Sequence, residues 1–308
     1  MKIAVAIPNH NQRWSVSESI RRLYSDSTKP CAVYVMSDDK PYINDLSDPG
    51  RVIAINNRDK FKGRCGNRNS VIREFLDSDF DALVFMDGDC YPYSSDFIGT
   101  YAKLFKKHDL IFGTRRHEDV SELSRPPSDL LTANMDNMWK KSKLDYTDLR
   151  VVSGAVREWQ SSKSFTEKLD LMLTGMIGWS CNFGITRDGL KKLTEFQSDI
   201  HGMDGEIFDS RAFGDGWGYE DVAMGLDALY AGLDIWITDQ VCVGHLSHER
   251  SDGLFDHVKG RHKIMERYRM LESATKNRSH TLRVMLVTYL FYIAGVITGL
   301  VTMSINIL

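Results

Sequence analysis

The amino-acid sequence predicts an α/β fold in which a mostly parallel sheet is flanked by helices. Over about the first 115 residues, short apolar runs alternate with amphipathic stretches, as strands and helices do in consecutive βα units. The apolar runs end in polar loops, and open α/β sheets bind ligands at that end of their strands. The chain has 308 residues, 42% hydrophobic and 26% charged, with 23 glycines and 7 prolines. This composition excludes a disordered or collagen-like chain and provides for one large domain or two small ones.

The elements of the first 115 residues follow from these patterns. Ser15 and Glu18, three residues apart, form a capping box that predicts the start of the first helix. Apolar runs predict strands at residues 3–7, 32–36, 52–55, 82–86 and 110–112. The stretches between them predict helices at residues 15–24, 66–76 and 97–106.

The pattern changes in the second part of the chain. Residues 115–135 are polar and contain Pro126-Pro127, which predicts a loop or a boundary. Beyond it we expect strands at residues 177–185, 235–238 and 241–243, and helices at residues 188–196, 219–230 and 254–274. The expected organisation is four consecutive parts, residues 1–115, 116–250, 251–283 and 284–308.

Positive charge is concentrated near the C-terminus. The formal net charge of the chain is −3, which excludes a polybasic nucleic-acid binder as a description of the whole chain. Residues 259–283 nevertheless hold eight basic and two acidic residues, a net charge of +6, so the remainder of the chain carries −9. A basic stretch on an acidic body predicts a local partner with negative charge.

The last 25 residues, 284–308, carry no charge and are rich in apolar side chains. As a helix with a rise of about 1.5 Å per residue they would span roughly 37 Å, enough to cross a membrane. The preceding basic stretch would stay on the cytoplasmic side, so the sequence favours a tail-anchored protein at an anionic membrane surface. A buried core helix or an amphipathic dimer helix is the alternative. Gly295 and Gly299 have the GxxxG spacing with which two such helices pair into a homodimer.

The cysteines and the N-terminus are consistent with a cytoplasmic location. The five cysteines are widely spaced and include no CxxC pair, which favours reduced thiols over disulfides or a zinc site. The first apolar run, residues 3–7, ends at Pro8 and is too short for the core of a signal peptide.

Two carboxylates follow the predicted strand 82–86. Asp87 and Asp89 are two residues apart, and Gly88 between them permits a sharp turn. Hard oxygen ligands at this end of a strand are suited to Mg²⁺ or Mn²⁺, which neutralises a diphosphate. An ordinary Asp-Gly turn is the alternative interpretation.

A second acidic cluster lies in the glycine-rich segment 214–221, directly before a predicted helix. Asp221 or Glu220 is suited to act as general base on an acceptor hydroxyl, with Trp217 as a platform for a sugar ring. The alternative is structural, because acidic residues in a first helical turn also complement the helix dipole.

Two further segments carry candidate groups. His245 and His248 are three residues apart and are candidate metal ligands, although such pairs also serve structural roles. Residues 62–69 form a basic, glycine-containing loop before a helix, which is suited to meet a phosphate or is a solvated turn.

Taken in chain order, these segments resemble the nucleotide-sugar glycosyltransferases of the GT-A fold, specifically the family-2-like group with the galactosyltransferase C-terminal motif. Residues 3–11 look like the opening strand and IPxYN loop of that family, and residues 63–69 are similar to its G…ARN segment. Residues 85–89 look like its DxD motif. Residues 178–183 resemble its GGN strand, and residues 217–221 its WGxED motif.

The resemblance implies a metal-dependent enzyme with a Rossmann-like GT-A domain over about residues 1–248. Asp87 and Asp89 would contact Mn²⁺ or Mg²⁺ and the diphosphate of the donor. His245 would be the third metal ligand, with His248 as the reserve candidate. Residues 1–115 would then bind the nucleotide-sugar, and residues 116–250 the acceptor.

The resemblance also implies roles for other residues. Asp221 would deprotonate the acceptor hydroxyl, and Glu220 would bind the acceptor. The implied donor-binding residues are Pro8, Asn9, Asn11, Asp38, Gly63, Arg64, Arg68, Asn69, Asp87 and Gly88. The implied acceptor-binding residues are Trp179, Asn182, Trp217, Gly218 and Tyr219.

The chain departs from the family pattern at two places. Asn9-His10-Asn11 replaces the usual Thr-Tyr-Asn, and Trp179-Ser180-Cys181 replaces the usual double glycine. The second departure leaves the identities of donor and acceptor open.

The expected activity is sugar transfer from a nucleotide-diphosphate sugar to an acceptor hydroxyl at a membrane surface. Inversion is favoured because Asp221 supplies a base for a single displacement. Uridine is the default donor base by resemblance, and a lipid-linked sugar or a growing glycan is the expected acceptor. Two alternatives remain. One is the same chemistry on nucleic acid; the other is a non-catalytic, membrane-tethered protein that binds nucleotide or sugar.

Overall fold

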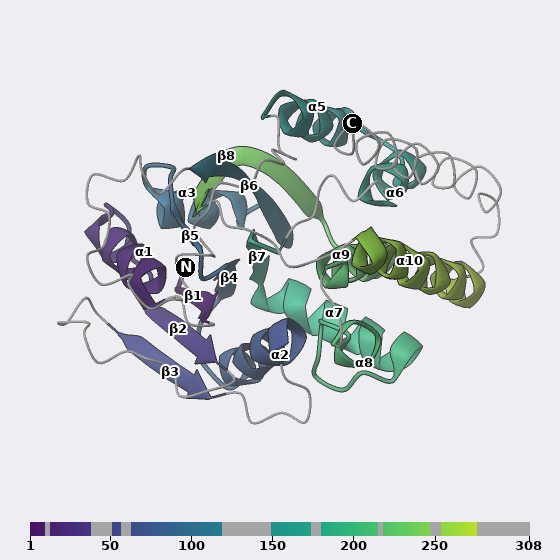
Figure 1. Cartoon of the computed structure of the whole chain (residues 1–308), viewed down its shortest axis with the longest axis horizontal. Helices are drawn as coiled ribbons and strands as arrows, with labels where there is room; N and C mark the ends of the chain where they lie inside the picture. The colour runs from purple at the N-terminus through teal and green to yellow at the C-terminus, as the bar shows by residue number, and fades with distance from the viewer. Residues whose placement is uncertain are drawn as a thin grey trace, which may run out of the picture.

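An eight-stranded sheet in the order β3-β2-β1-β4-β7-β6-β8-β5 forms the centre of the computed structural model (Figure 1). The structure describes residues 1–9, 13–37, 51–56, 63–118, 149–173, 180–214, 218–246 and 254–275. Within these ranges the chain has the α/β architecture that the sequence predicts.

The first half of the sheet is parallel and contains four of the predicted strands. These are β1 (Ile3–Pro8), β2 (Ala32–Ser37), β3 (Val52–Asn56) and β4 (Ala82–Met86). Side chains alternate between the two faces of each strand, so Val5 packs in one apolar core and Ala4 in the other. Because both faces are covered, β1, β2 and β4 read as continuous apolar runs, whereas β3 at the edge of the sheet is partly exposed.

The second half makes the sheet mixed. Strand β7 (Asn182–Thr186) runs antiparallel to both of its neighbours, β4 and β6 (Leu110–Glu118). Strand β8 (Ile235–Leu246) is parallel to β6. The last strand, β5 (Cys90–Pro92), is antiparallel to β8. The reversal between β4 and β7 brings the residues before β7 to the carboxyl end of β4.

The sequence predicts two strands where the structure has the single strand β8. Phe112 of β6 is opposite Ile237, whereas Thr114 is opposite Cys242, so the extra residues of β8 form a bulge. The backbone N–H of Gln240 donates to the Thr238 side chain within that bulge, at 3.2 Å. The predicted break therefore corresponds to a bulge in a continuous strand.

Helices cover both faces of the sheet (Figure 1). Helices α1 (Arg13–Ser25) and α3 (Phe97–Leu104) contribute apolar residues to the core on one face. The helices that contribute to the other core are α2 (Gly63–Leu76), α5 (Leu149–Ser161), α6 (Phe165–Leu173), α7 (Arg187–His201), α8 (Ser210–Phe213), α9 (Glu220–Tyr230) and α10 (Leu254–Thr275). The described part of the chain therefore has three layers, helix on sheet on helix.

The capping-box prediction for the first helix is wrong. Helix α1 begins at Arg13, so Ser15 lies in its first turn, and Glu18 accepts hydrogen bonds from Arg21 and Arg22. The Ser15 hydroxyl donates instead to the backbone carbonyl of Gly88. Ser15 therefore connects two elements and does not cap the helix.

A buried network attaches α10 to the other helices on its face. Arg267 of α10 donates to both carboxylate oxygens of Asp227 in α9, at 2.9 and 3.1 Å, and to Asp209 at 2.7 Å. Gln197 and His201 of α7 also contact Asp227, at 2.6 and 3.2 Å. Burial opposes ionisation of Asp227, but His201 and Arg267 outweigh it and lower the pKa of this carboxyl. Helix α10 is thus joined to the domain by paired charges as well as by apolar contacts.

The network reduces the positive charge that α10 offers to a partner. In addition to Arg267, Arg261 donates to the Tyr219 hydroxyl at 3.1 Å, and Lys263 donates to the Ala212 carbonyl. Lys259 and Arg269 are exposed. Part of the charge from which an anionic partner was predicted is therefore neutralised or bonded within the fold.

Two predictions fall wholly or largely outside the described ranges. The predicted loop at residues 115–135 lies mostly outside them, and the predicted anchor at 284–308 lies wholly outside. Among the helices that the structure does describe, none is both long enough and apolar enough to span a bilayer.

Candidate active site

The Asp87-Gly88-Asp89 turn lies at the carboxyl end of β4, between β4 and β5. The Cys90 amide donates to the Asp87 carbonyl at 3.0 Å and closes the turn, and the Asp87 amide donates to the Cys181 carbonyl at 3.2 Å. The second bond exists because β7 runs opposite to β4, so that Cys181, just before β7, is beside Asp87. The turn is therefore held by backbone bonds on two sides, at the usual ligand position of an open α/β sheet.

Helix α1 holds the same turn from a third side. Ser15 donates to the Gly88 carbonyl, and Ser19, one helical turn later, donates to the Cys90 carbonyl. Both serines are buried. The two hydroxyls fix the backbone on either side of Asp89.

Replacing Ser15 with Ala is expected to lower the free energy of unfolding by about 1 kcal/mol, because it leaves the Gly88 carbonyl without this donor. Urea unfolding measures the difference. Ser25→Ala is the matched control, because the Ser25 hydroxyl bonds the Arg21 carbonyl of the same helix in an exposed position. A loss in Ser15→Ala no larger than in the control would show that the hydroxyl does not hold the turn.

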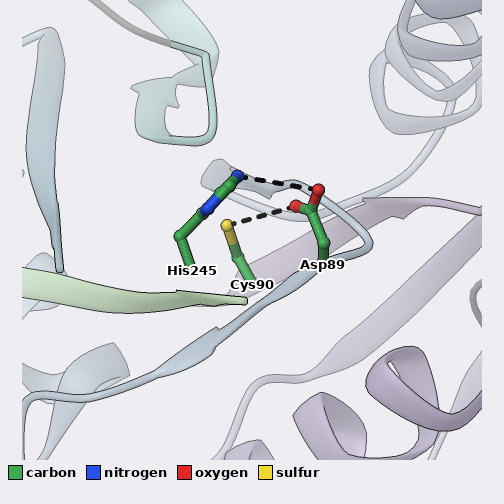
Figure 2. A group of neighbouring side chains, drawn as sticks. All are labelled: Asp89, Cys90 and His245. Carbon is green, nitrogen blue, oxygen red and sulfur yellow. Dashed lines mark hydrogen bonds and ion pairs between the residues drawn. The ribbon is translucent and has the colours of Figure 1, made fainter. Parts of the chain in front are cut away.

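Asp89 and His245 form the centre of a compact group of ligand atoms (Figure 2). The His245 Nε2 atom is 3.6 Å from Asp89 Oδ2, and the Cys90 Sγ atom is 3.6 Å from Asp89 Oδ1. All three ligand atoms lie within 4.8 Å of one another, and all three residues are buried. One nitrogen and one carboxylate at this separation fit a divalent cation such as Mn²⁺ or Mg²⁺. Burial and then the neighbouring Cys181 thiol raise the pKa of the Cys90 thiol well above its ordinary value.

Arg68 of α2 links the turn after β4 to the start of α9. Its guanidinium donates to Asp87 Oδ1 at 2.8 Å and to Glu220 Oε1 at 3.0 Å, and its side chain is only 2% exposed. Burial disfavours the charge, but Asp87 and Glu220 outweigh that effect and raise the pKa of Arg68 above its ordinary value. A permanent cation thus lies between the two acidic clusters that the sequence identified separately.

Asp221 follows Glu220 in the first turn of α9. Burial, together with the charge of Glu220, raises the pKa of Asp221 to about 6, against opposing effects of hydrogen bonding and of Arg68. The Ser180 amide donates to Asp221 Oδ2 at 3.1 Å and orients the carboxylate. A carboxylate with a pKa near 6 is suited to accept a proton at neutral pH.

The backbone before α9 has an unusual conformation. Gly218 has a φ of 84°, and Tyr219 has a φ of 71°, a left-handed conformation that few residues other than glycine adopt. The Tyr219 ring packs against Gly260 of α10, where an added Cβ would come within 2.3 Å of the ring. Helix α10 thereby supports the Gly218-Tyr219 backbone, which positions Glu220 and Asp221 at the start of α9.

Two asparagines that were predicted to bind ligands use their side-chain amides for hydrogen bonds within the protein. The Asn182 side chain donates to the Thr114 and Val241 carbonyls, both at 3.0 Å, and accepts from Tyr101 at 2.7 Å. Asn69 donates from its side chain to the Phe208 carbonyl at 2.8 Å. Both asparagines are completely buried, so the described conformation offers neither side chain to a ligand.

The remaining predicted positions divide into two groups. Pro8 and Asn9 lie at the carboxyl end of β1, next to β4, and Gly63 and Arg64 begin α2. The predicted residues that lie outside the described ranges are Asn11, Asp38, Trp179, Trp217 and His248.

Sequence reasoning missed several residues of this site. Ser19 and Ser180 contact it through bonds across the fold, and no local pattern marks them as functional. Cys90 contacts it through the neighbouring Asp89. Cys90 does directly follow the Asp87-Gly88-Asp89 motif, so its proximity to a candidate metal ligand was a signal that the sequence contained.

The mixed α/β sheet and the acidic site at its edge agree with the class of glycosyltransferase that the sequence resembles. Residues 4–194 match the family described as Glycosyl transferase family 2, and the chain belongs to that family. The match ends before residues 217–221, so it does not include the WGxED-like segment. The comparison with curated proteins finds no match.

Solved structures share the fold at low sequence identity. TarS of S. aureus in complex with UDP is 13% identical with a TM-score of 0.50, over 89% of this chain and 65% of that one. The chain spans only 39% of the longer TarS structure. The mannosyltransferase PcManGT of Pyrobaculum calidifontis, with GDP-Man and Mn²⁺, is 11% identical with a TM-score of 0.49, over 96% of this chain and 80% of that one. The likeness to TarS supports a GT-A-like fold for this chain.

Proposed function

We propose that this chain transfers a sugar, with inversion and with the help of a divalent cation, from a nucleotide-diphosphate sugar to an acceptor hydroxyl. The observation that carries the proposal is the bridge made by Arg68. It joins the turn that contains the Asp89 cation ligand to the Glu220-Asp221 pair, so both halves of the reaction are organised at one edge of the sheet.

The donor half of the site is built around Asp89 and His245, which would hold Mn²⁺ or Mg²⁺. The cation would supply positive charge that stabilises the diphosphate leaving group. Asp87 lies on the same turn, where its partly exposed carboxylate pairs with Arg68. TarS is described with UDP, which supports a nucleotide donor here as well.

The acceptor half depends on Asp221. Its raised pKa leaves it ionised above about pH 6 while keeping it basic enough to take the proton of an attacking hydroxyl. The Ser180 amide fixes the direction of the carboxylate, and Glu220 is held in place by Arg68. When the base activates the acceptor hydroxyl, that hydroxyl attacks the donor sugar directly and no covalent sugar–enzyme intermediate forms. Such a single displacement inverts the configuration of the anomeric carbon.

We include membrane attachment in the proposal. The uncharged residues 284–308 follow a basic stretch, the order expected of a C-terminal anchor whose catalytic domain is cytoplasmic. A lipid-linked sugar or a surface glycan would then be the acceptor, and UDP the default nucleotide of the donor. Flotation of the full chain with anionic vesicles, compared with a chain ending at residue 283, tests the attachment.

The reaction is tested with the full chain in detergent and a panel of UDP- and GDP-sugars. We expect slow release of the nucleoside diphosphate from one donor in the presence of Mn²⁺, suppression by a chelator, and a loss of at least about 10²-fold in Asp89→Asn. Asp199→Asn, an exposed carboxylate on α7, is the matched control. Nucleotide binding that is independent of metal and of Asp89, with no turnover even when acceptors are added, would indicate a non-catalytic protein.

A further inference from the structure

We propose that Cys90 is a third ligand of the cation site and that its sulfur makes the site selective for softer cations, Zn²⁺ above all. The inference rests on the proposed function only in that both place a cation at Asp89 and His245. It goes further by adding a ligand from this chain that changes which metal the site prefers.

The positions of the three ligand atoms carry the inference. Cys90 Sγ and His245 Nε2 face the Asp89 carboxylate from the same side, each 3.6 Å from one of its oxygens (Figure 2). A tetrahedral zinc ion has ligand bonds of about 2.0–2.3 Å, which places neighbouring ligand atoms about 3.3–3.8 Å apart. The distances from the Asp89 oxygens to Cys90 Sγ and to His245 Nε2, both 3.6 Å, lie within this range. All three ligand atoms lie within 4.8 Å of one another.

The sheet fixes this arrangement. Cys90 begins β5 and is directly opposite His245 of β8 in the antiparallel pair. Asp89 immediately precedes Cys90, and the Ser19 hydroxyl bonds the Cys90 carbonyl. The pairing of β5 with β8 therefore holds Cys90 and His245 side by side, with Asp89 next to them in the turn.

The chemistry of the donor set favours zinc over manganese. Carboxylate, imidazole and thiolate together form a ligand set typical of Zn²⁺, whereas Mn²⁺ and Mg²⁺ prefer oxygen. Divalent affinity also rises from Mn²⁺ through Co²⁺ to Zn²⁺ for a given site. When the sulfur–metal bond forms, the thiol proton leaves to solvent, so binding releases one proton from Cys90. Zn²⁺ is thus expected to displace Mn²⁺ and to inhibit transfer supported by Mn²⁺.

Cobalt provides a direct probe, because thiolate ligation gives Co²⁺ an intense charge-transfer absorption. The test uses the full chain in detergent with the exposed Cys31 replaced by Ser in every variant. We expect the band in this background and its loss in Cys90→Ser. The substitution should weaken Zn²⁺ binding more than Mn²⁺ binding, which electron paramagnetic resonance measures. Cys181→Ser is the matched control, because Cys181 is a buried thiol that interacts with Cys90, and it should keep the band.

A second measurement needs no substitution at the site. Zinc-edge X-ray absorption of the zinc-loaded protein should show one sulfur at about 2.3 Å. Absence of sulfur from the zinc shell, or a cobalt band that survives Cys90→Ser, would overturn the inference. Donor turnover with Mn²⁺ but without zinc–sulfur ligation would leave the proposed function standing, and the reverse result would leave only the soft-metal site.

Discussion

The variant Arg68→Met is expected to lose at least about 10²-fold in transfer rate and about 3–5 kcal/mol of unfolding free energy. Arg68 is the buried cation between Asp87 and Glu220, and its removal leaves these carboxylates, with Asp221 beside them, without their shared counter-charge. Loss of one partner from a buried ion pair is far more destabilising than loss of a surface charge.

Two comparisons separate the roles of charge and geometry at this position. Arg68→Lys keeps the charge but lacks the planar fork that contacts both carboxylates, so it should recover stability more than activity. Lys107→Met removes an exposed cation and should change neither quantity by more than about 0.5 kcal/mol or twofold. Urea unfolding and donor turnover are the two measurements. An Arg68→Met protein as stable as Lys107→Met would show that the bridge does not hold the site together.

The second large effect is expected for Asp221→Asn, which should reduce kcat by about 10²–10⁴-fold because the amide cannot accept the acceptor proton. The same variant should be as stable as the parent at pH 7.5, or more stable. Burial next to Glu220 disfavours the ionised carboxyl, and a neutral amide avoids that effect. Activity and thermal unfolding of Asp199→Asn, measured in parallel, provide the control.

The raised pKa of Asp221 also sets the direction of the pH dependence. Its pKa is raised from 3.8 to about 6, so its contribution to stability is full below about pH 4 and is lost as the pH rises through about 6. Activity should change in the opposite direction and increase through about pH 6 as the base ionises. A kcat/KM profile with no ionisation near pH 6, or a catalytic rate of Asp221→Asn within tenfold of the parent, would remove Asp221 from the role of base.

Most of the parallel half of the fold could be predicted from sequence because β1, β2 and β4 are buried on both faces. Continuous apolar runs with polar ends mark such strands, and β4 has the predicted bounds of residues 82–86. The short strand β5 has only three residues and depends on pairing with the distant β8. An element this short shows no periodic pattern in the sequence. Helix α8, with four residues, was missed because it is equally short.

For the site, the sequence located the acidic residues but not their connections. Asp87, Glu220 and Arg68 were each identified as candidates, yet the bridge joins residues 152 positions apart and required the fold. Asn182 shows the opposite case. It occupies a segment that resembles a family motif, while its amide is bonded to three groups in the core. Residue type and spacing indicate which chemistry is available, and the tertiary contacts decide where it is used.

The Arg267 network has a consequence for synthesis of the chain on the ribosome. Asp209 and Asp227 leave the exit tunnel well before Arg267, which follows them by 58 and 40 residues. Until that arginine emerges, folding the central helices would bury Asp227 without its cation, which is strongly unfavourable. The nascent domain is therefore expected to complete its native packing only after α10 has emerged, so that a chain truncated before this helix remains a target for chaperones and proteases.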